Sequence, residues 1–334
     1  MKRISIKDVA RAANVSITTV SHTLSGKGVL KDETRQHVLQ VAKELNYVPD
    51  YHASSMKKGK TNAIALFTNS IKGYYHDFAL GIRIESEKRG YELDIIMSSE
   101  PKRVMDMLIS NRVDGAVIRH DNLTMEHSAL LEQMGIPIVY MDRAALGKHS
   151  ASVVLDSYDT GRTVAEYLYG LGHRHMMVIT GRDTYNSNER TRGFCEYLAT
   201  KGVSVDKEYF LESDFSTQIA FDEMTAFLEK GLPLPDAIFA LNDDSAFGCI
   251  NALHNKGISV PNDVSVVGCD NLQICDWFMP SLTSVNTSGF LQGTTAAKQL
   301  FRIIEGQTAE NVKIPGKLVE RASCQKKKTN KTPD

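Results

Sequence analysis

The sequence contains no apolar run near the length of a membrane span, which needs about 20 consecutive apolar residues, although 42% of its 334 residues are hydrophobic. It also lacks a cationic start followed by an apolar segment, the pattern of a secretory leader. These two absences argue against a membrane-embedded or exported protein. We therefore expect a chain that works in the cytoplasm and does not bind a membrane.

Cysteine pairs and catalytic signatures are missing as well. The cysteines number five and none stands in a C-x-x-C pair, so reduced, mostly buried thiols are expected rather than disulfides or a zinc site. The chain has no Walker A loop, no G-x-S-x-G elbow and no H-E-x-x-H helix. His173 and His175 in GHRHMM sit at an expected helix-to-strand turn, where capping or solvent exposure is a simpler interpretation than metal binding. We expect no enzyme, no catalytic residue, no metal and no cofactor.

Charge is unevenly distributed along the chain. The formal net charge is −1, yet residues 1–60 carry +6 and the remainder carries −7. A small basic segment joined to a larger acidic body is typical of a protein whose basic part meets a polyanion. Composition alone leaves a solvated basic face as an alternative.

The stretch DVARAANVSITTVSHTLSGKG near the start contains two short apolar-periodic segments with one polar break between them. We predict a helix over 6–13, a turn at Asn14, and a second helix over 17–24 that is capped by Ser16. A third helix over 32–45 supplies the remaining apolar side chains. This pattern predicts a helix-turn-helix motif, whose second helix enters the major groove of DNA. A small helical subdomain with a polar face is the alternative.

From residue 63 onward, short apolar runs alternate with amphipathic segments. Continuous apolar runs of this length fit strands that are buried on both faces, and their alternation with helices predicts parallel sheets. Strands are expected at 63–67, 92–97, 114–118, 137–141, 151–156, 176–180, 209–211, 236–241, 264–268, 283–286 and 312–320. Helices are expected at 75–90, 101–111, 126–134, 158–171, 187–201, 216–230, 244–256 and 289–305.

These elements predict an α/β protein with two doubly wound parallel-sheet lobes, preceded by a small all-α domain. The seam between the lobes falls near residues 141–155, and the last strands suggest that the chain crosses back over it. We expect a helix-turn-helix domain at 1–48, a linker at 49–61, a two-lobed domain at 62–325, and a disordered basic tail at 326–334. Two such lobes face each other across a crevice at the carboxyl ends of their strands, where ligands bind.

The segment ISIKDVARAANVSITTVSHTLSGKGVLKDETRQHVLQVAKELNYVPDYHASSMKKGKT resembles the head of the LacI/GalR family of bacterial transcriptional regulators. The resemblance continues through GLGHRHMMVITG, NERTRGF, NDDSAFG, GISVPNDVSVVGCDN and PSLTSV, and therefore spans essentially the whole chain. It implies a homodimeric, repressor-like protein with a periplasmic-binding-protein-like body. It further implies a pseudo-palindromic double-stranded operator and a small-molecule effector as partners.

The resemblance also assigns roles in the second helix. It implies base contacts for Ile17, Thr18 and His22, phosphate contacts for Thr19 and Ser21, and the helix cap for Ser16. Ile17 has no hydrogen-bonding group, so it can read only a thymine methyl group or the shape of the groove. Ser25 stands where the family usually has Asn, which puts a backbone contact at that position in doubt.

The linker is expected to form a short hinge helix only against DNA or a partner chain, because isolated helices shorter than about 12 residues are marginal in water. The family wedges an apolar side chain, usually Leu, into the minor groove at this point. Here the matching residue is Met56, flanked by Ala53 and Lys57. Packing of Met56 against the body is the alternative.

Four places in the body match effector-contacting positions of the family. The side chains they imply are Tyr74, Tyr75, Arg190, Asn242, Asp243 and Asp270, with Asp156 and Trp277 as weaker candidates. An Asp at position 156 can simply cap the helix that follows, and Trp277 lines either the crevice or the lobe below it. Arg, Asp and Asn satisfy hydroxyl groups, each of which both donates and accepts a hydrogen bond.

The sequence therefore predicts a sequence-specific transcriptional repressor controlled by a sugar or sugar derivative. A nucleobase or nucleoside is the alternative effector, since two adjacent tyrosines can stack on a flat ring, and a protein coregulator stays open. A solute-binding protein without a regulatory role is the alternative from another class. The basic head and the missing leader argue against it.

Overall fold

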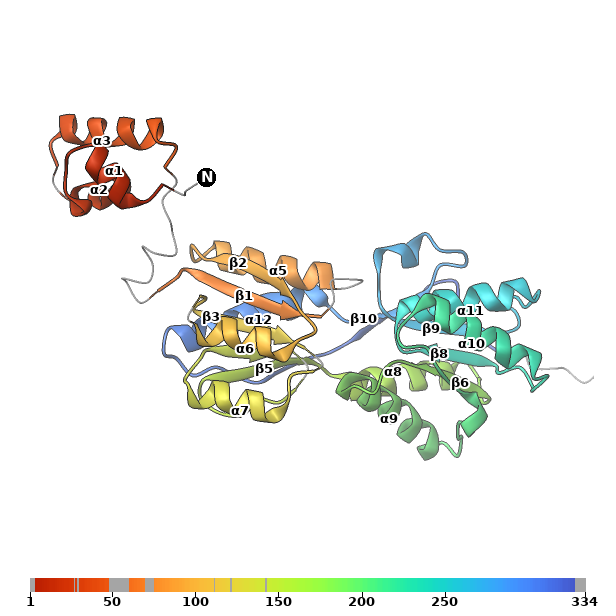
Figure 1. The fold of residues 1–334 in the computed structure, drawn as a ribbon. Helices are drawn as coiled ribbons and strands as arrows, with labels where there is room; N and C mark the ends of the chain where they lie inside the picture. The colour runs from red at the N-terminus through yellow and green to blue at the C-terminus, as the bar shows by residue number, and fades with distance from the viewer. Residues whose placement is uncertain are drawn as a thin grey trace, which may run out of the picture. The chain divides into compact units, whose positions relative to one another are not determined.

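The computed structural model describes residues 4–26, 28, 30–47, 60–69, 75–110, 112–120, 122–141 and 143–327. The chain divides into two compact units, residues 1–61 and residues 62–334, and Figure 1 shows both. The smaller unit is helical, and the larger one consists of two α/β lobes. The predicted fold class is confirmed.

The small unit contains the helices α1 (Ile6–Ala12), α2 (Ile17–Leu24) and α3 (Asp32–Glu44). Their apolar faces meet in one core built around Val9, Val20 and Val38, each of which is fully buried. The turn between α1 and α2 passes through Asn14 at φ 50°, a left-handed conformation that Asn tolerates better than most residues. Packing against one another and against α3 stabilises α1 and α2, since these two helices alone are too short to be stable in water.

The first lobe is built on a six-stranded sheet with strand order β11-β5-β4-β3-β1-β2, in which all neighbours are parallel. The strands are β1 Ala63–Thr68, β2 Glu92–Met97, β3 Gly115–Arg119, β4 Ile138–Tyr140, β5 Ser150–Leu155 and β11 Val312–Ile314. The helices are α5 Tyr75–Glu87, α6 Pro101–Ile109, α7 Met125–Gln133 and α12 Gly289–Ile304. Because α5 and α12 pack on one face and α6 and α7 on the other, β1 is buried along its whole length.

The second lobe is built on another six-stranded sheet with the strand order β12-β10-β9-β8-β6-β7, in which only the edge strand β12 is antiparallel to its neighbour. Its strands are β6 Met176–Thr180, β7 Phe210–Glu212, β8 Ala237–Ala240, β9 Ser265–Asp270, β10 Thr283–Asn286 and β12 Lys317–Val319. Its helices are α8 Ser157–Gly170, α9 Tyr185–Thr200, α10 Thr217–Glu229 and α11 Asp243–Asn255, with the 3-10 turns η1 Lys207–Tyr209 and η2 Gln273–Asp276. Helices α8 and α9 cover one face of the sheet, and α10 and α11 cover the other.

Three connections join the lobes: β5 to α8, β10 to α12, and β11 to β12. The connection from β11 to β12 shows that the prediction of one strand over 312–320 is wrong, because that stretch forms two strands in different sheets. The break includes Gly316, where an added Cβ would lie 2.7 Å from both Thr160 Oγ1 and Val285 Cγ1. Only glycine fits there without a shift of its neighbours.

Two residues of the expected disordered tail, 326 and 327, belong to the described chain and pack on the second lobe. The described chain continues through Lys327, whose N–H donates to the Leu171 carbonyl at 2.8 Å and whose Nζ lies 2.7 Å from Asp236 Oδ2. Of the five free cysteines, three are buried and two are half-buried. No described helix is both long and apolar enough to cross a membrane.

The two histidines of GHRHMM are not exposed caps. His173 is buried, and its Nε2 lies 3.1 Å from the Gln325 carbonyl. The His175 ring packs edge-on against Tyr209, with centroids 4.3 Å apart. Among the described residues no group of three or more His, Cys, Asp or Glu side chains is placed to hold a metal ion.

Candidate DNA-reading helix and effector cavity

Helix α2 divides its side chains between the core and the surface. Val20 and Thr23 are buried, whereas the predicted base-reading residues Ile17, Thr18 and His22 are exposed. Because α2 presents a short polar face of this kind outside the core, it has the form of a recognition helix.

The Ser16 cap is present as the sequence predicts. The Ser16 hydroxyl accepts the Thr19 N–H at 3.0 Å and lies 2.8 Å from the Thr19 hydroxyl. Ser21 is exposed and Thr19 is half-buried. The first turn of α2 is therefore fixed in place, and the base and phosphate contacts of its side chains stay predictions. The hinge residues Ala53, Met56 and Lys57 lie outside the described residues.

A cavity of about 730 Å³ lies between the two lobes of the large unit. The first lobe and its connections to the second contribute Asn69, Tyr75, Arg119, Leu155, Thr287 and Gln292. The second lobe contributes Arg182, Thr184, Tyr185, Asn186, Arg190, Asp214, Phe215, Ser216, Thr217, Gln218, Leu241, Asn242, Asp244 and Asp270. Four of the predicted effector residues, Tyr75, Arg190, Asn242 and Asp270, are thus brought together on one cavity. Tyr74 lies outside the described residues.

Arg190 is placed by the close packing of α8 against α9. A Cβ added to Gly161 would lie 1.9 Å from the Arg190 carbonyl, and one added to Gly193 would lie 2.0 Å from the Tyr158 carbonyl. These two glycines let the helix backbones touch. The Arg190 side chain is buried and its Nη1 donates to the Leu241 carbonyl, while its Nε has no hydrogen-bond partner among the described residues. A buried guanidinium N–H without an acceptor is costly unless a ligand supplies one.

Asp270 stands at the carboxyl end of β9 and lines the cavity. Burial and the negative charge of Asp243 raise its pKa well above the usual range, against the opposing charges of Arg190 and Arg119. A carboxyl group in this environment favours its protonated form, which both donates and accepts hydrogen bonds. It is therefore suited to a ligand hydroxyl.

An aromatic wall closes the cavity on the side of the second lobe. The Phe215 ring packs so tightly on Gly181 that an added Cβ would lie 2.0 Å from it. Asp214 and Phe215 both have positive φ, at 51° and 58°, which is unusual for residues other than glycine. Asn242 holds this turn by donating from Nδ2 to the Phe215 carbonyl at 3.3 Å. On the other lobe, the Arg119 guanidinium lies 4.6 Å from the centroid of the Tyr75 ring.

The placement of the side chains corrects the prediction for Asp243 and favours the alternative interpretations of Asp156 and Trp277. Asp243 is fully buried outside the cavity, because it sits in the first turn of α11 and accepts hydrogen bonds from within the protein. Asp156 caps α8 by accepting the Asp159 N–H at 3.1 Å and is not among the lining residues. Trp277 is 79% exposed and is not among the residues that line the cavity.

Several lining residues were missed by the sequence analysis, although a signal for them was present. Asn69 and Arg182 lie one and two residues beyond the ends of β1 and β6, and Arg119 ends β3. The carboxyl ends of parallel strands face the crevice in such folds, so every polar residue at these positions was a candidate. Phe215 had no such signal, because the turn that presents it is fixed by tertiary contacts.

Comparison with known proteins places this geometry in a family. Residues 5–50 match the family described as "Bacterial regulatory proteins, lacI family", and residues 165–324 match the "Periplasmic binding protein-like domain". The HTH-type transcriptional repressor PurR of Actinobacillus pleuropneumoniae serotype 3 (strain JL03) is 33% identical over 309 residues, which cover 90% of this chain and 91% of that protein.

The chain belongs to the LacI family. The HTH-type transcriptional regulator DegA of Bacillus subtilis (strain 168) is 31% identical over 334 residues, covering 96% of this chain and 98% of its own. The solved complex of the transcriptional regulator CelR with cellobiose aligns with a TM-score of 0.73 and 27% identity, covering 96% of this chain and 100% of that one.

Membership in the LacI family establishes the general activity. The family consists of transcriptional regulators rather than enzymes, and this chain is a DNA-binding transcriptional regulator with a helix-turn-helix head. The alternative of a solute-binding protein without a regulatory role is excluded by the match over residues 5–50.

Proposed function

We propose that this LacI-family protein is a repressor that binds a two-fold symmetric operator as a homodimer. We further propose that it is controlled by a sugar or sugar derivative bound between its lobes. Repression is supported by the relatives named PurR, which are called repressors. The effector is argued from the cavity itself.

The unpartnered polar atoms of the cavity carry this proposal. Arg190 Nε and Thr287 Oγ1 are both buried without a hydrogen-bond partner in the part of the chain that the structure describes, and both residues line the cavity. The first is a donor, and the second both donates and accepts. Together with the carboxyl group of Asp270 they match a ligand whose groups also donate and accept, as ring hydroxyls do. The cellobiose complex of CelR is a relative whose ligand belongs to this class.

A nucleobase or nucleoside is the second candidate, and the aromatic side chains favour it. Tyr75, Tyr185 and Phe215 all line the cavity, and flat rings stack on aromatic faces. Sugars also pack on such faces, so stacking alone does not separate the two classes. The density of charged and amide groups around the cavity supports the sugar.

A thermal-melting panel separates these effectors. We would record the melting temperature of the full chain with mono- and disaccharides, including cellobiose, and with purines, pyrimidines and nucleosides. A compound at 100 times its Kd stabilises the native state by about 2.7 kcal/mol. We expect at least one sugar to raise the melting temperature, and we expect Arg190→Ala to abolish that rise.

Arg192→Ala is the matched control. Arg192 lies on the same helix, and its guanidinium pairs with Glu189 at 2.8 Å on the exposed side. This variant should keep the full response to the sugar. A response to nucleobases alone would replace the sugar with the second candidate. A response to no compound in the panel would contradict both and leave a protein coregulator as the alternative.

The dimer is supported by the helix-turn-helix head and by the apolar surface of the second lobe. Helix-turn-helix proteins read two half-sites as symmetric dimers. Ile274, Trp277 and Met279 are 52%, 79% and 86% exposed within one short segment, and a second copy would cover them. We call these three residues the apolar patch.

A further inference from the structure

Asp243 is a buried carboxylate that the effector cavity does not use. Its side chain accepts hydrogen bonds from Ser284 Oγ at 2.6 Å, from the Leu272 N–H at 2.8 Å and from Cys275 Sγ at 3.1 Å. None of its surface is exposed. Three donors from two segments, residues 272–275 and β10, therefore converge on one side chain that has no contact with solvent.

Gly268 leaves space for the Asp243 carboxylate because glycine has no side chain. A Cβ added to Gly268 would lie 2.2 Å from Asp243 Oδ1. Strand β9 thus has a gap in its side-chain row opposite α11, and the carboxylate fills it. An alanine at position 268 would displace Asp243, because real Cβ contacts do not come this close.

The hydrogen bonds of Asp243 hold the turn that carries Asp270. This turn has left-handed backbone at two consecutive non-glycine residues, Asp270 at φ 125° and Asn271 at φ 56°. Such conformations are strained and persist only where the surroundings fix them. Here Asn271 N–H donates to Ser284 Oγ at 3.0 Å, and Ser284 in turn donates to Asp243. The Leu272 N–H closes the turn on the same carboxylate.

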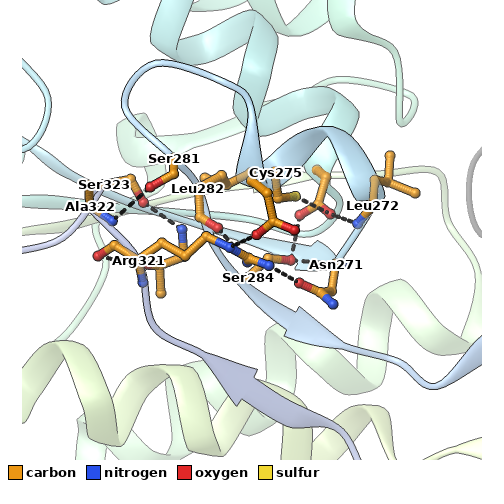
Figure 2. A network of polar contacts seen from close by, with 12 residues as sticks. Asn271, Leu272, Cys275, Ser281, Leu282, Ser284, Arg321, Ala322 and Ser323 are labelled. Atoms are coloured by element: carbon orange, nitrogen blue, oxygen red, sulfur yellow. Dashed lines mark hydrogen bonds and ion pairs between the residues drawn. The ribbon is translucent and has the colours of Figure 1, made fainter.

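Arg321 holds the other side of the turn, just beyond β12 (Figure 2). Its Nη2 donates to Asn271 Oδ1 at 2.8 Å, its Nη1 to the Leu282 carbonyl at 2.9 Å, and its Nε to Asp276 Oδ1 at 2.6 Å. The Arg321 side chain is 12% exposed. One planar guanidinium therefore joins the turn after β9 to η2, and its three donors use the fork geometry that lysine lacks.

We infer that Asp243 and Arg321 are positioning residues, which hold Asp270 in place on the effector cavity and fix residues 270–276 as one rigid segment. The inference rests on the proposed effector site for its function. The same segment carries Ile274 of the apolar patch. The network therefore links the wall of the cavity to the surface that we assign to the second copy.

The test uses Arg321→Lys, which keeps the positive charge and removes the fork. We would titrate the carboxyl carbon of Asp270 by NMR in the full chain and follow hydrogen exchange of residues 268–279. Burial and the adjacent Asp243 raise the pKa of Asp270, so a loosened turn should move its titration midpoint down towards the usual range. Exchange of the segment should rise by roughly tenfold, the factor that corresponds to about 1.4 kcal/mol.

Ser284→Ala is a second variant, which removes the hydroxyl between Asp243 and Asn271 and should act in the same direction. Arg162→Lys is the matched control. Arg162 forms a surface pair with Asp159 at 2.7 Å on α8, and its replacement should leave Asp270 and the segment unchanged.

The outcomes distinguish a positioning role of Asp243 and Arg321 from a contribution to the stability of the fold alone. If both variants lower the melting temperature while the Asp270 titration and the exchange of 268–279 stay as in the wild type, the inference is wrong. A shifted titration together with a melting panel that finds no sugar leaves the positioning role intact and contradicts the proposed effector.

Discussion

Thr283 and Thr287 are two buried threonines at β10 that differ in their hydrogen bonds. The Thr283 hydroxyl accepts the Arg321 N–H at 2.8 Å and lies 3.3 Å from the Arg321 carbonyl. The Thr287 hydroxyl is buried and has no partner among the described residues, and Thr287 is one of the residues that line the effector cavity. A buried hydroxyl without a partner lowers stability relative to an apolar group of the same shape. A ligand that forms a hydrogen bond with the Thr287 hydroxyl would explain why a threonine stands at this position.

Replacing each threonine with valine tests this explanation. Thr283→Val leaves the Arg321 N–H without an acceptor and should lower the free energy of unfolding by about 1–3 kcal/mol. Thr287→Val should change it by less than about 0.5 kcal/mol, or raise it. Urea denaturation of the ligand-free chain measures both. Equal losses in the two variants would show that the Thr287 hydroxyl already has a partner in the free protein.

At the scale of elements, the C-terminal segment 321–327 acts as a strap on the second lobe. Gln325 N–H donates to Ser265 Oγ at 3.2 Å, and the Gln325 carbonyl lies 3.1 Å from His173 Nε2. Lys327 binds Asp236, which also accepts the backbone N–H groups of Arg174 and His175. Two titratable side chains, His173 and Asp236, therefore anchor the strap.

Both anchors make the strap sensitive to acid. Burial lowers the pKa of His173, against the opposing hydrogen bond to Gln325. Burial raises the pKa of Asp236, but the hydrogen bonds from Lys327 and the backbone outweigh it and lower the pKa overall. In each case the unfolded state binds more protons than the folded state. The stability contributed by each group is therefore fully present above its unfolded pKa and is lost as the pH falls from there through its folded pKa.

We predict that the melting temperature of the large unit falls as the pH decreases from 7 to 5, since the unfolded pKa of His is about 6.5. The contribution of Asp236 should be lost only below about pH 4. In His173→Gln the decrease between pH 7 and 5 should be smaller. His254→Gln, at the exposed end of α11, is the control and should follow the wild type. Parallel curves for all three proteins would contradict the role of His173.

At the scale of the whole molecule, the apolar patch and the helix-turn-helix head both favour the proposed homodimer. The proposed homodimer needs a surface that holds its two copies together, and the exposed apolar side chains of the patch favour burial against a second copy. Its three side chains are among the most exposed large hydrophobic residues that the structure describes. Since Ile274 sits in the segment fixed by Arg321, effector binding and association of the two copies would share one structural unit.

The double variant Trp277→Glu/Met279→Glu should therefore shift the protein from dimer to monomer in sedimentation velocity. Its circular dichroism should stay that of the wild type, because both side chains are exposed in the single chain. Leu232→Glu introduces the same charge at another exposed apolar position of the second lobe, where Leu232 is 38% exposed. It should remain a dimer. A dimeric double variant would place the interface elsewhere.

Local features of the fold could be predicted from the sequence, whereas a feature that depends on long-range contacts could not. Continuous apolar runs such as 63–67 predicted buried strands, and the helices 17–24 and 289–305 were predicted to within one residue of their observed bounds. The stretch 312–320 was predicted as one strand, because nothing in its composition shows that Pro315 and Gly316 pass from one sheet to the other. That division depends on the contact of Gly316 with Thr160 and Val285.

The candidate site shows the same division. Motif positions identified Arg190, Asn242 and Asp270, all of which line the cavity. They also proposed Asp243, which is buried, does not line the cavity and accepts a hydrogen bond from the turn that carries Asp270. Asp243 and Asp244 are adjacent acids in the first turn of one helix. Their side chains point in different directions because successive helical residues are about 100° apart, and only the packing of α11 on β9 shows which one faces the cavity.

The sequence by itself determined the order and type of the elements, the family, and the polar residues at the ends of the strands. These properties depend on hydrophobic periodicity, capping and local motifs, which act over a few residues. The tertiary structure alone decided which side chains share the cavity, which carboxylate is enclosed, and how Arg321 meets the turn after β9. Those contacts join residues more than 25 positions apart, so their geometry exists only once both sheets have formed.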